Sequence, residues 1–385
     1  MTDDSPTLGA VVDLLHEWYP PSTADSWDKV GLVSGDPDRE VARVMFAVDP
    51  TLEVAREAVE RGADLLVVHH PLFLTPVSSV AATTPKGRVL HTLASGDCAL
   101  LTAHTNADQA EGGVSESLAL ALGLEDLQPI LPAPGPVLDK VVTFVPHAHA
   151  ESVRAAMTAA GAGQLGDYDS CTWSTTGEGR FRPLDGADPT IGSVGRLEVV
   201  PETRVEAVVA RSRRAAVVRA LLYAHPYEEP AFDVIELADP GTAATGSGRL
   251  GQVEETTLAD FADRVARALP PTAHGVRVAG DPQRSVRKVA VCGGAGDFLL
   301  DRMAGADVDV YLTSDLRHHR ASEFIEHGGP ALVDVAHWAA EWTWLPAVRR
   351  RLDAALAERG WGDRVGTHVS TLCTDPWNFR PEESR

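Results

Sequence analysis

Short apolar runs alternate with amphipathic segments of helical period through the first part of the chain. Leu8–Trp18 has the period of an amphipathic helix, and the apolar runs at 41–50, 64–71 and 98–108 predict buried strands. The segment 51–63 predicts a helix between the first two strands. Strands joined by helices of this length imply right-handed βαβ crossovers and a mainly parallel sheet.

The same alternation returns after residue 248. Strands are expected at 288–294, 308–315 and 331–337, and helices at 258–269, 296–306, 318–328 and 339–360. We therefore expect the first and last segments of the chain to close one sheet system.

Two stretches rich in proline, glycine and small residues interrupt this pattern, at 131–137 and 238–248. The residues between them alternate as strand, helix, two strands, helix and strand, which predicts a ferredoxin-like α+β unit. The predicted fold is an α/β outer domain with mainly parallel sheets, interrupted by this insert. The predicted domains are 1–136 and 248–385, the two halves of the outer domain, and 137–240, the insert.

The composition limits the partners of this protein more than its ligands. The 385 residues carry a formal net charge of -21, which disfavours nucleic acid and anionic membranes as partners. A small anionic substrate remains compatible, because bound divalent cations invert the potential inside one cleft. The four cysteines form no CxxC pair, and no apolar run has the length of a signal-peptide core or a membrane span. We therefore expect a cytoplasmic protein.

Five side chains that suit a metal follow apolar strands in three parts of the chain. His69 and His70 end the run LLVVHH, and Asp108 follows the third predicted strand. His337 and Glu341 stand four residues apart at a strand–helix junction, a spacing that puts both side chains on one helical face. The carboxyl ends of parallel strands meet at one sheet edge, where ligands bind in such folds. The five residues are therefore predicted to converge there.

This set of side chains favours a pair of divalent ions. Three imidazoles and two carboxylates suit Zn, Mn, Fe or Ni better than Ca or Mg. A single tetrahedral zinc needs fewer ligands, whereas two ions bridged by a carboxylate use all of them and acidify water into a nucleophile. Each element also has an ordinary interpretation. Adjacent histidines occur by chance, a His/Glu pair at this spacing often lies on a solvated helix face, and an aspartate often caps a turn.

Two further polar features follow strands in the last part of the chain. His318 and His319 can support a metal site or bind substrate, or they can begin a helix with Asp315 as its cap. The turn CGGAGD at 292–297 can offer backbone amides to a phosphate or can be a bare tight turn.

Seven stretches, spread in order along nearly the whole chain, resemble one known family. They are SWDKVGLVSGD (26–36), ADLLVVHHPLF (63–73), AHTNADQAEGGV (103–114), GSGRLG (246–251), VCGGAGD (291–297), VDVYLTSDLRHH (308–319) and DVAHWAAEW (334–342). The family is that of the GTP cyclohydrolase I type II homologues, also called Nif-three-like dinuclear metal centre hexameric proteins. Each stretch is weak alone, but their conjunction is specific.

The resemblance implies an α/β fold, a toroidal homohexamer and a site for two metal ions per subunit. It assigns the metal ions to His69, His70, Asp108, His337 and Glu341. His104 matches a family histidine close to that site. Within the insert, the stretches 166–173, 177–192 and 224–234 resemble the PII/CutA-like domain of longer family members.

Three positions depart from the family pattern, and none of them is a ligand position. Lys29 stands where the family usually has Asn, and Ser314 and Ala336 each replace a common Gly. These departures bear on substrate contacts more than on metal binding.

The leading hypothesis is a metal-dependent hydrolase that acts on GTP or another nucleotide-like small molecule. In GTP cyclohydrolase chemistry the attack is at C8 of guanine, and His104 or His318 is the candidate to move protons. The rival is a non-catalytic, metal-binding regulatory hexamer whose PII-like insert senses small molecules. A DNA-associated ring is disfavoured by the net charge.

Overall fold

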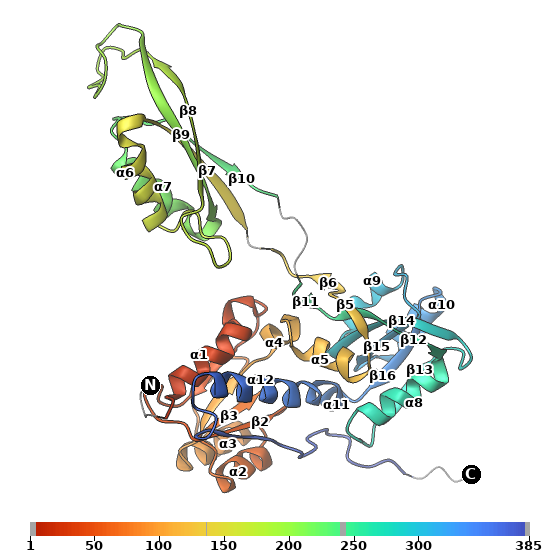
Figure 1. The fold of residues 1–385 in the computed structure, drawn as a ribbon. Helices are drawn as coiled ribbons and strands as arrows, with labels where there is room; N and C mark the ends of the chain where they lie inside the picture. Colours follow the sequence, from red (N-terminus) through yellow and green to blue (C-terminus); the bar gives the residue numbers. More distant parts are fainter. Residues whose placement is uncertain (1–4, 136, 239–243, 382–385) are drawn as a thin grey trace. The chain divides into compact units, whose positions relative to one another are not determined.

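The computed structural model describes residues 5–135, 137–238 and 244–381. The chain divides into two compact units, an outer unit of residues 1–133 with 244–385 and an insert of residues 134–243. Within the outer unit, two short strands on either side of the insert, β6 (Leu131–Pro132) and β11 (Gly246–Ser247), pair with each other (Figure 1).

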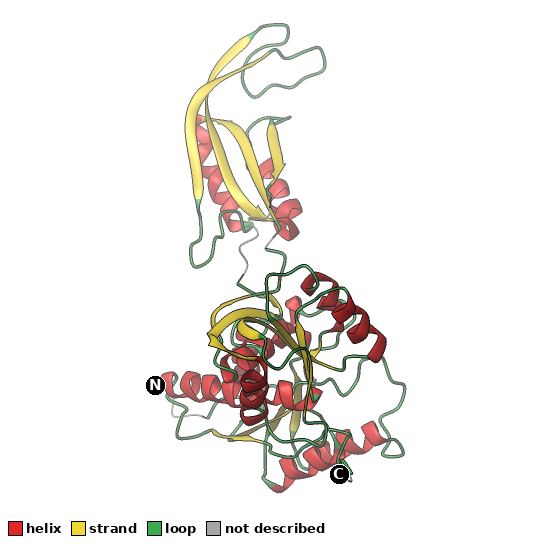
Figure 2. Ribbon diagram, turned by 90° about the vertical axis from the view of Figure 1, so that its right-hand side faces the viewer, coloured by secondary structure: helices red, strands yellow, loops and turns green. Residues whose placement is uncertain are grey.

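Five strands form the first sheet of the outer unit. Their order is β1 (Gly31–Ser34), β4 (Ala99–Thr102), β3 (Leu65–Val68), β2 (Arg43–Ala47) and β17 (Gly366–Val369). The last four of these run parallel to one another, and β1 is antiparallel to β4. Figure 2 shows the strands of this unit lying between helices.

Alternate residues of the central strands pack into two separate clusters. Phe46 and Val67 join the cluster formed with α1 (Leu8–Trp18) and α12 (Trp344–Glu358). Met45 and Leu66 join the cluster formed with α2 (Leu52–Glu60) and α3 (Pro85–Ser95). Because neighbouring side chains of a strand point to opposite faces, an uninterrupted apolar run needs helices on both sides of the sheet.

Six strands form the second sheet. Their order is β13 (Val276–Ala279), β16 (Ala331–Val335), β15 (Val310–Ser314), β14 (Ser285–Ala295), β12 (Arg249–Thr257) and β5 (Glu125–Gln128). The pairs β16–β15 and β15–β14 are parallel, and the other pairs are antiparallel. The expectation of a mainly parallel arrangement is therefore wrong for this sheet, and the fold is mixed α/β. Buried and partly exposed residues alternate through the first part of β12, a pattern that antiparallel strands allow.

The two halves of the chain exchange strands across the insert. β17, near the C-terminus, lies beside β2, and β5, just before the insert, lies at the edge of the second sheet beside β12. The first and last segments therefore build two sheets rather than the single sheet system that the apolar pattern predicts. One apolar cluster joins residues of both sheets, so the outer unit has a shared core.

The remaining helices of the outer unit connect these strands. They are α4 (Thr105–Gln109), α5 (Val114–Ala121), α8 (Leu258–Ala268), α9 (Leu300–Met303), α10 (His318–Glu326) and α11 (His337–Trp342). The pattern predicts one helix at 339–360, but the chain forms α11 and α12, separated at Thr343. Pro346 lies in the first turn of α12, where its missing N–H costs no helical hydrogen bond. Within the described residues, no helix is both long and apolar enough to cross a membrane.

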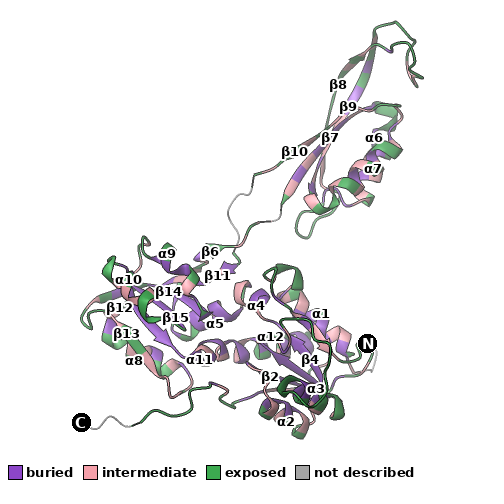
Figure 3. Cartoon of the chain, turned by 180° about the vertical axis from the view of Figure 1, so that it is seen from behind, coloured by how far each residue is buried: buried purple, intermediate pink, exposed green. Residues whose placement is uncertain are grey.

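The insert has the element order of a ferredoxin-like unit. Its elements are β7 (Leu138–Pro146), α6 (Ala150–Ala159), β8 (Thr172–Phe181), β9 (Glu198–Ala210), α7 (Arg214–Ala224) and β10 (Phe232–Glu236). The strand order is β10-β7-β9-β8 with every pair antiparallel, and both helices lie on one face of the sheet (Figure 1). The insert has its own apolar core. Figure 3 shows that its strand β8 is mostly exposed, unlike the central strands of the outer unit.

Candidate metal centre

Segments that follow strands of both sheets bring the predicted ligands together. His69 and His70 follow β3, and Asp108 lies in α4 directly after β4. His337 begins α11, directly after β16 of the second sheet, and Glu341 lies one turn later. The side chains therefore meet between the carboxyl ends of two sheets, whereas the sequence pattern suggests a single sheet edge.

Glu341 lies at the centre of these side chains. Its side chain is 3% exposed, and its Oε1 lies 2.7 Å from Nε2 of His337 and 3.3 Å from Nε2 of His69. Its Oε2 lies 3.1 Å from Nε2 of His70. Oδ1 of Asp108 lies 3.6 Å from the same nitrogen of His69. Three imidazoles thus face one carboxylate, and a second carboxylate lies beside them.

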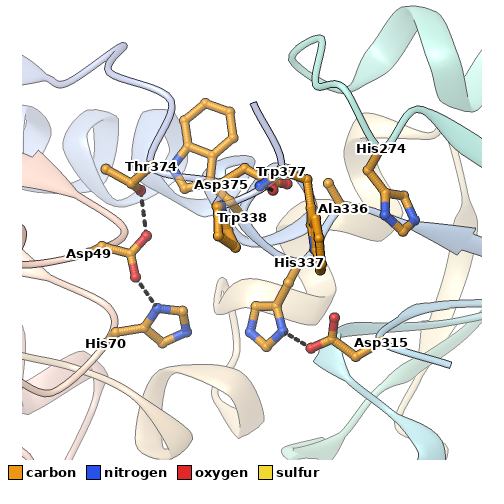
Figure 4. A pocket seen from close by; sticks show the side chains of 11 residues that line it. Asp49, His70, His274, Asp315, Ala336, His337, Trp338, Thr374, Asp375 and Trp377 are labelled. Atoms are coloured by element: carbon orange, nitrogen blue, oxygen red, sulfur yellow. Dashed lines mark hydrogen bonds and ion pairs between the residues drawn. The ribbon is translucent and has the colours of Figure 1, made fainter. Parts of the chain in front are cut away.

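The other ring nitrogen of each histidine is held by an oxygen. In His69, Nδ1 contacts the carbonyl oxygen of Ala103 at 2.9 Å. In the other three rings Nδ1 contacts a carboxylate: His70 with Asp49 at 2.7 Å, His104 with Asp28 at 2.9 Å, and His337 with Asp315 at 2.7 Å. An ionised carboxylate or a carbonyl only accepts, so Nδ1 carries a proton, and Nε2 is the nitrogen that could ligate a metal once it is unprotonated. Figure 4 shows this for His70 and His337, with their carboxylates on the outer side of each ring. This is how ligating imidazoles are oriented in metal sites.

Three buried polar atoms at this centre lack a hydrogen-bond partner within the described part of the chain. They are Nε2 of His69, Oδ1 of Asp108 and Oε2 of Glu341. Leaving such atoms unpaired is costly, and bound divalent metal would offer them a partner. The potential ligand atoms form two sets, and within each set the atoms lie within 4.8 Å of one another. One set is His69, His70 and His104, and the other is His70, His337 and Glu341. The residues therefore fit a metal, and the two sets share His70.

The charges of these groups are tightly coupled. Burial alone would raise the pKa of Glu341, but the imidazoles of His70, His69 and His337 hold it well below the usual range. Burial alone would lower the pKa of His70 and His337, but Glu341 and the Nδ1-bound carboxylates raise it to about 11 and about 10, respectively. Protons and a divalent cation compete for the same nitrogens.

His104 and Asp108 titrate differently from the imidazoles around Glu341. Burial, together with the charge of His69, lowers the pKa of His104 to about 4, despite its contact with Asp28. Burial raises the pKa of Asp108 to about 6. His104 is therefore a neutral imidazole at neutral pH, with Nδ1 fixed and Nε2 able to accept a proton or to ligate a metal.

The sequence of the whole chain matches one protein family. The model of Duf34/NIF3 (NGG1p interacting factor 3) matches residues 6–376. The chain belongs to the Duf34/NIF3 family. A Mycobacterium tuberculosis relative called GTP cyclohydrolase 1 type 2 homolog is 50% identical over 380 residues, 98% of each protein. The resemblance seen in the seven motifs is thereby confirmed.

Two solved structures share this fold. A Bacillus cereus protein related to NIF3 is 36% identical with a TM-score of 0.74, and the match covers 98% of this chain and 100% of that one. A Staphylococcus aureus protein is 29% identical with a TM-score of 0.81, and the match covers 98% of this chain and 99% of that one.

In this NIF3-family chain, the glycine turn after β14 packs directly against the candidate ligands. Gly294 has a φ of 68°, and a Cβ there would lie 2.7 Å from Oε1 of Glu341 and 3.3 Å from Nε2 of His337. Only glycine fits both the conformation and the space. The backbone of the motif CGGAGD thus lies in close contact with the candidate ligands, with no side chain between them at Gly294.

Sequence reasoning missed the carboxylates that hold the histidines. Asp49 follows β2 closely and Asp315 follows β15 directly, so their position after apolar strands was the available signal. The prediction weighed Asp315 only as a helix cap. Asp28 is 7% exposed and lies within the family stretch 26–36, but the pattern alone gives it no role.

The second histidine doublet lies apart from the groups around Glu341. His318 is exposed, and its ring meets that of His319 edge to face, with 5.2 Å between centroids. It lines a different cavity together with Arg277 and Ile325. Asp315, three residues earlier, is the part of this segment that contacts a candidate ligand.

Proposed function

We propose that this protein is a metal-dependent hydrolase that binds two divalent ions per subunit and acts on GTP or another nucleotide-like substrate. The observation that carries the proposal is Glu341, whose two buried oxygens face the Nε2 atoms of three imidazoles. The names of the relatives, GTP cyclohydrolase 1 type 2 homolog, support the substrate class.

Two ions fit the donor set better than one. The two sets of ligand atoms share His70, and Glu341 offers one oxygen to His70 and the other to His69 and His337. Asp108 adds an oxygen beside His69. Zn, Mn, Fe and Ni all suit these ligands, and such ions supply Lewis acidity and lower the pKa of water.

We assign proton transfer to His104 rather than to His318. Asp28 fixes Nδ1 of His104, and the low pKa of this imidazole leaves it unprotonated and able to take a proton at neutral pH. His318 is exposed and lines another cavity, so its contacts lend no support to a catalytic role.

The proposal includes a cytoplasmic homohexamer, as the family resemblance implies. It also includes kinship of the insert with PII/CutA-like domains. The ferredoxin-like strand order of the insert is compatible with that kinship.

The proposal is tested on the purified full chain by metal analysis and by incubation with a panel of nucleotides. We expect stoichiometric divalent metal, and turnover that disappears in Glu341→Gln and in His70→Ala. Glu254→Gln, at an exposed position outside the site, is the matched control and keeps both properties. A wild-type protein without stoichiometric metal would refute the proposal.

A second candidate function is a metal-binding regulatory scaffold with a sensor insert. It is favoured by a cavity of about 580 Å³ in the insert, whose lining includes Phe181, Glu202 and Tyr227. The Tyr227 hydroxyl donates to the nearly buried Glu202 at 2.9 Å, so a polar pair lies in an otherwise partly apolar cavity. Tight nucleotide binding without product would favour this candidate over the hydrolase.

A further inference from the structure

Two cavities of the outer unit meet at the candidate metal centre. One, of about 250 Å³, has a lining that includes Asp49, His70, His274, His337, Trp338 and Trp377; we call it the tryptophan cavity. The other, of about 430 Å³, has a lining that includes Asp49, Thr51, Leu52, His70, Lys86 and Arg88; we call it the lysine cavity. Asp49 and His70 line both, so the two cavities adjoin at the same edge of the candidate metal centre.

The lysine cavity has two cationic side chains, Lys86 and Arg88, and one carboxylate, Asp49, in a chain of net charge -21. Lys86 and Arg88 are exposed, and within the described residues neither forms an ion pair; Lys86 lies over the Phe73 ring at 6.0 Å. The first turns of α2 and α3 also line this cavity, and the partial positive charge of both helix N-termini adds to that of the side chains. Cations without an ion-pair partner, close to two helix N-termini, suit a phosphate group.

The tryptophan cavity offers an aromatic surface on the other side of His70. Trp377 is 69% exposed although it is large and apolar, and Trp338 is buried at the base of the same cavity. In Figure 4 the segment Thr374–Trp377 lies across the cavity from the imidazoles of His70 and His337. An exposed indole facing a cavity is a stacking surface for a planar ring.

The C-terminal segment is tied to the candidate metal centre. The Thr374 hydroxyl donates to Asp49, which in turn accepts from Nδ1 of His70 at 2.7 Å. The Asp375 carboxylate accepts from the backbone N–H of Trp377 at 2.8 Å and so fixes the turn that presents the indole. The backbone that carries Trp377 is thus tied, through Thr374 and Asp49, to the ring of His70.

We propose that the lysine cavity binds the phosphate end of the substrate through Lys86 and Arg88, while the tryptophan cavity stacks a planar ring on Trp377. This inference rests on the proposed function, because it orients a nucleotide-like substrate across the same metal centre. It defines the substrate as a phosphorylated planar heterocycle and names the side chains that select each end.

The test measures binding to the metal-loaded full chain by calorimetry with three ligands: inorganic triphosphate, guanosine and GTP. For Lys86→Gln/Arg88→Gln we expect about tenfold or greater loss of affinity for triphosphate and GTP, with guanosine unchanged. For Trp377→Leu we expect about tenfold loss for guanosine and GTP, with triphosphate unchanged, and recovery in Trp377→Phe. Arg287→Gln/Arg302→Gln removes the same charge from exposed positions outside both cavities and serves as the control.

Metal content separates failure of this inference from failure of the proposed function. If each variant keeps its metal and triphosphate binding survives Lys86→Gln/Arg88→Gln, or guanosine binding survives Trp377→Leu, the assignment of the two cavities is wrong. If Trp377→Leu changes the oligomeric state and leaves ligand binding intact, the indole is an assembly contact and the assignment is likewise wrong. A wild-type chain without metal would instead refute the proposed function.

Discussion

Each unit of the chain contains a fully buried carboxylate, and the two are neutralised in different ways. In the insert, Asp139 is 0% exposed and lies 2.9 Å from Nη2 of Arg211 and 2.7 Å from Nε of Arg214. In the outer unit, Glu341 is 3% exposed and faces the imidazoles. Arginine keeps its proton at any relevant pH, so the Asp139 cluster is permanently satisfied. Imidazoles release theirs, so a metal can replace the protons around Glu341.

The comparison teaches how to separate a structural ion cluster from a metal site. Both carboxylates have a pKa below the usual range, Asp139 chiefly through its hydrogen bond from Arg214 and Glu341 through its imidazoles despite burial. The shift by itself does not distinguish them. The distinguishing features are the identity of the cations and the buried atoms left without partners.

The largest effect on metal binding is expected for Glu341→Gln. The amide removes the charge and puts an N–H where a ligand oxygen would be needed, so any metal held by Glu341 would lose a donor. We expect the metal content per chain to fall close to zero, as measured by elemental analysis after gel filtration. A Glu341→Gln protein that keeps its full metal content would show that Glu341 is no more a ligand than Asp139.

A smaller loss of metal binding is expected when a carboxylate that contacts the Nδ1 atom of a histidine is removed. Asp49→Ala removes the acceptor of the His70 Nδ1–H and should weaken metal binding by roughly 10–100-fold in a competition titration. Asp38→Ala, at an exposed position, is the control. Unchanged affinity would mean that His70 is oriented without Asp49.

Gly294→Ala tests the packing of backbone against the ligands. Because φ is 68° and the added Cβ would crowd Oε1 of Glu341, we expect stability to fall by about 1–2 kcal/mol and metal binding to weaken. Gly305→Ala has open space around its Cβ and should cost little. Denaturant unfolding and metal titration of both variants measure the difference. Equal stability and equal metal affinity of the two variants would contradict the close approach of the Gly294 backbone to Glu341.

The imidazoles around Glu341 predict a pH dependence for chelator-treated protein. The folded pKa of His70 is about 11 and that of His337 about 10, both above the unfolded value near 6.5. Their contribution to stability is therefore fully present below about pH 6.5 and is lost as pH rises through the folded values. Thermal melts should show this loss in wild-type and a smaller loss in Glu341→Gln, in which Asp49 and Asp315 still contact the two rings. Metal binding should release protons, and calorimetry in buffers of different ionisation heat would detect it.

Asp139→Asn is expected to leave metal binding unchanged. It should instead destabilise the insert by leaving Arg211 and Arg214 without their buried partner. Because the folded pKa of Asp139 is lowered, its contribution is present above the unfolded pKa and is lost as pH falls through the folded value. Proteolysis of the insert at decreasing pH would measure this loss, which Asp139→Asn should abolish.

The local elements of the fold were predictable because apolar periodicity is written in neighbouring residues. The helix α1 has the predicted bounds Leu8–Trp18, and the strand β3 lies within the run at 64–71. The pairing of strands was not predictable, because β5 and β17 are short and join partners far away in sequence. Their positions depend on the shared core rather than on their own residues.

The sequence by itself determined the alternation of strands and helices, the family, and the side chains His69, His70, Asp108, His337 and Glu341 as candidates, because these are properties of local pattern and motif order. Only the tertiary structure decided that the ends of two sheets bring these side chains together around Glu341. It also showed that Asp28, Asp49 and Asp315 contact the Nδ1 atoms of three of the histidines. Trp377 lines one cavity together with His70 and His337. The physical reason is that distances between side chains on separate strands are set by packing across the whole core, which no local segment encodes.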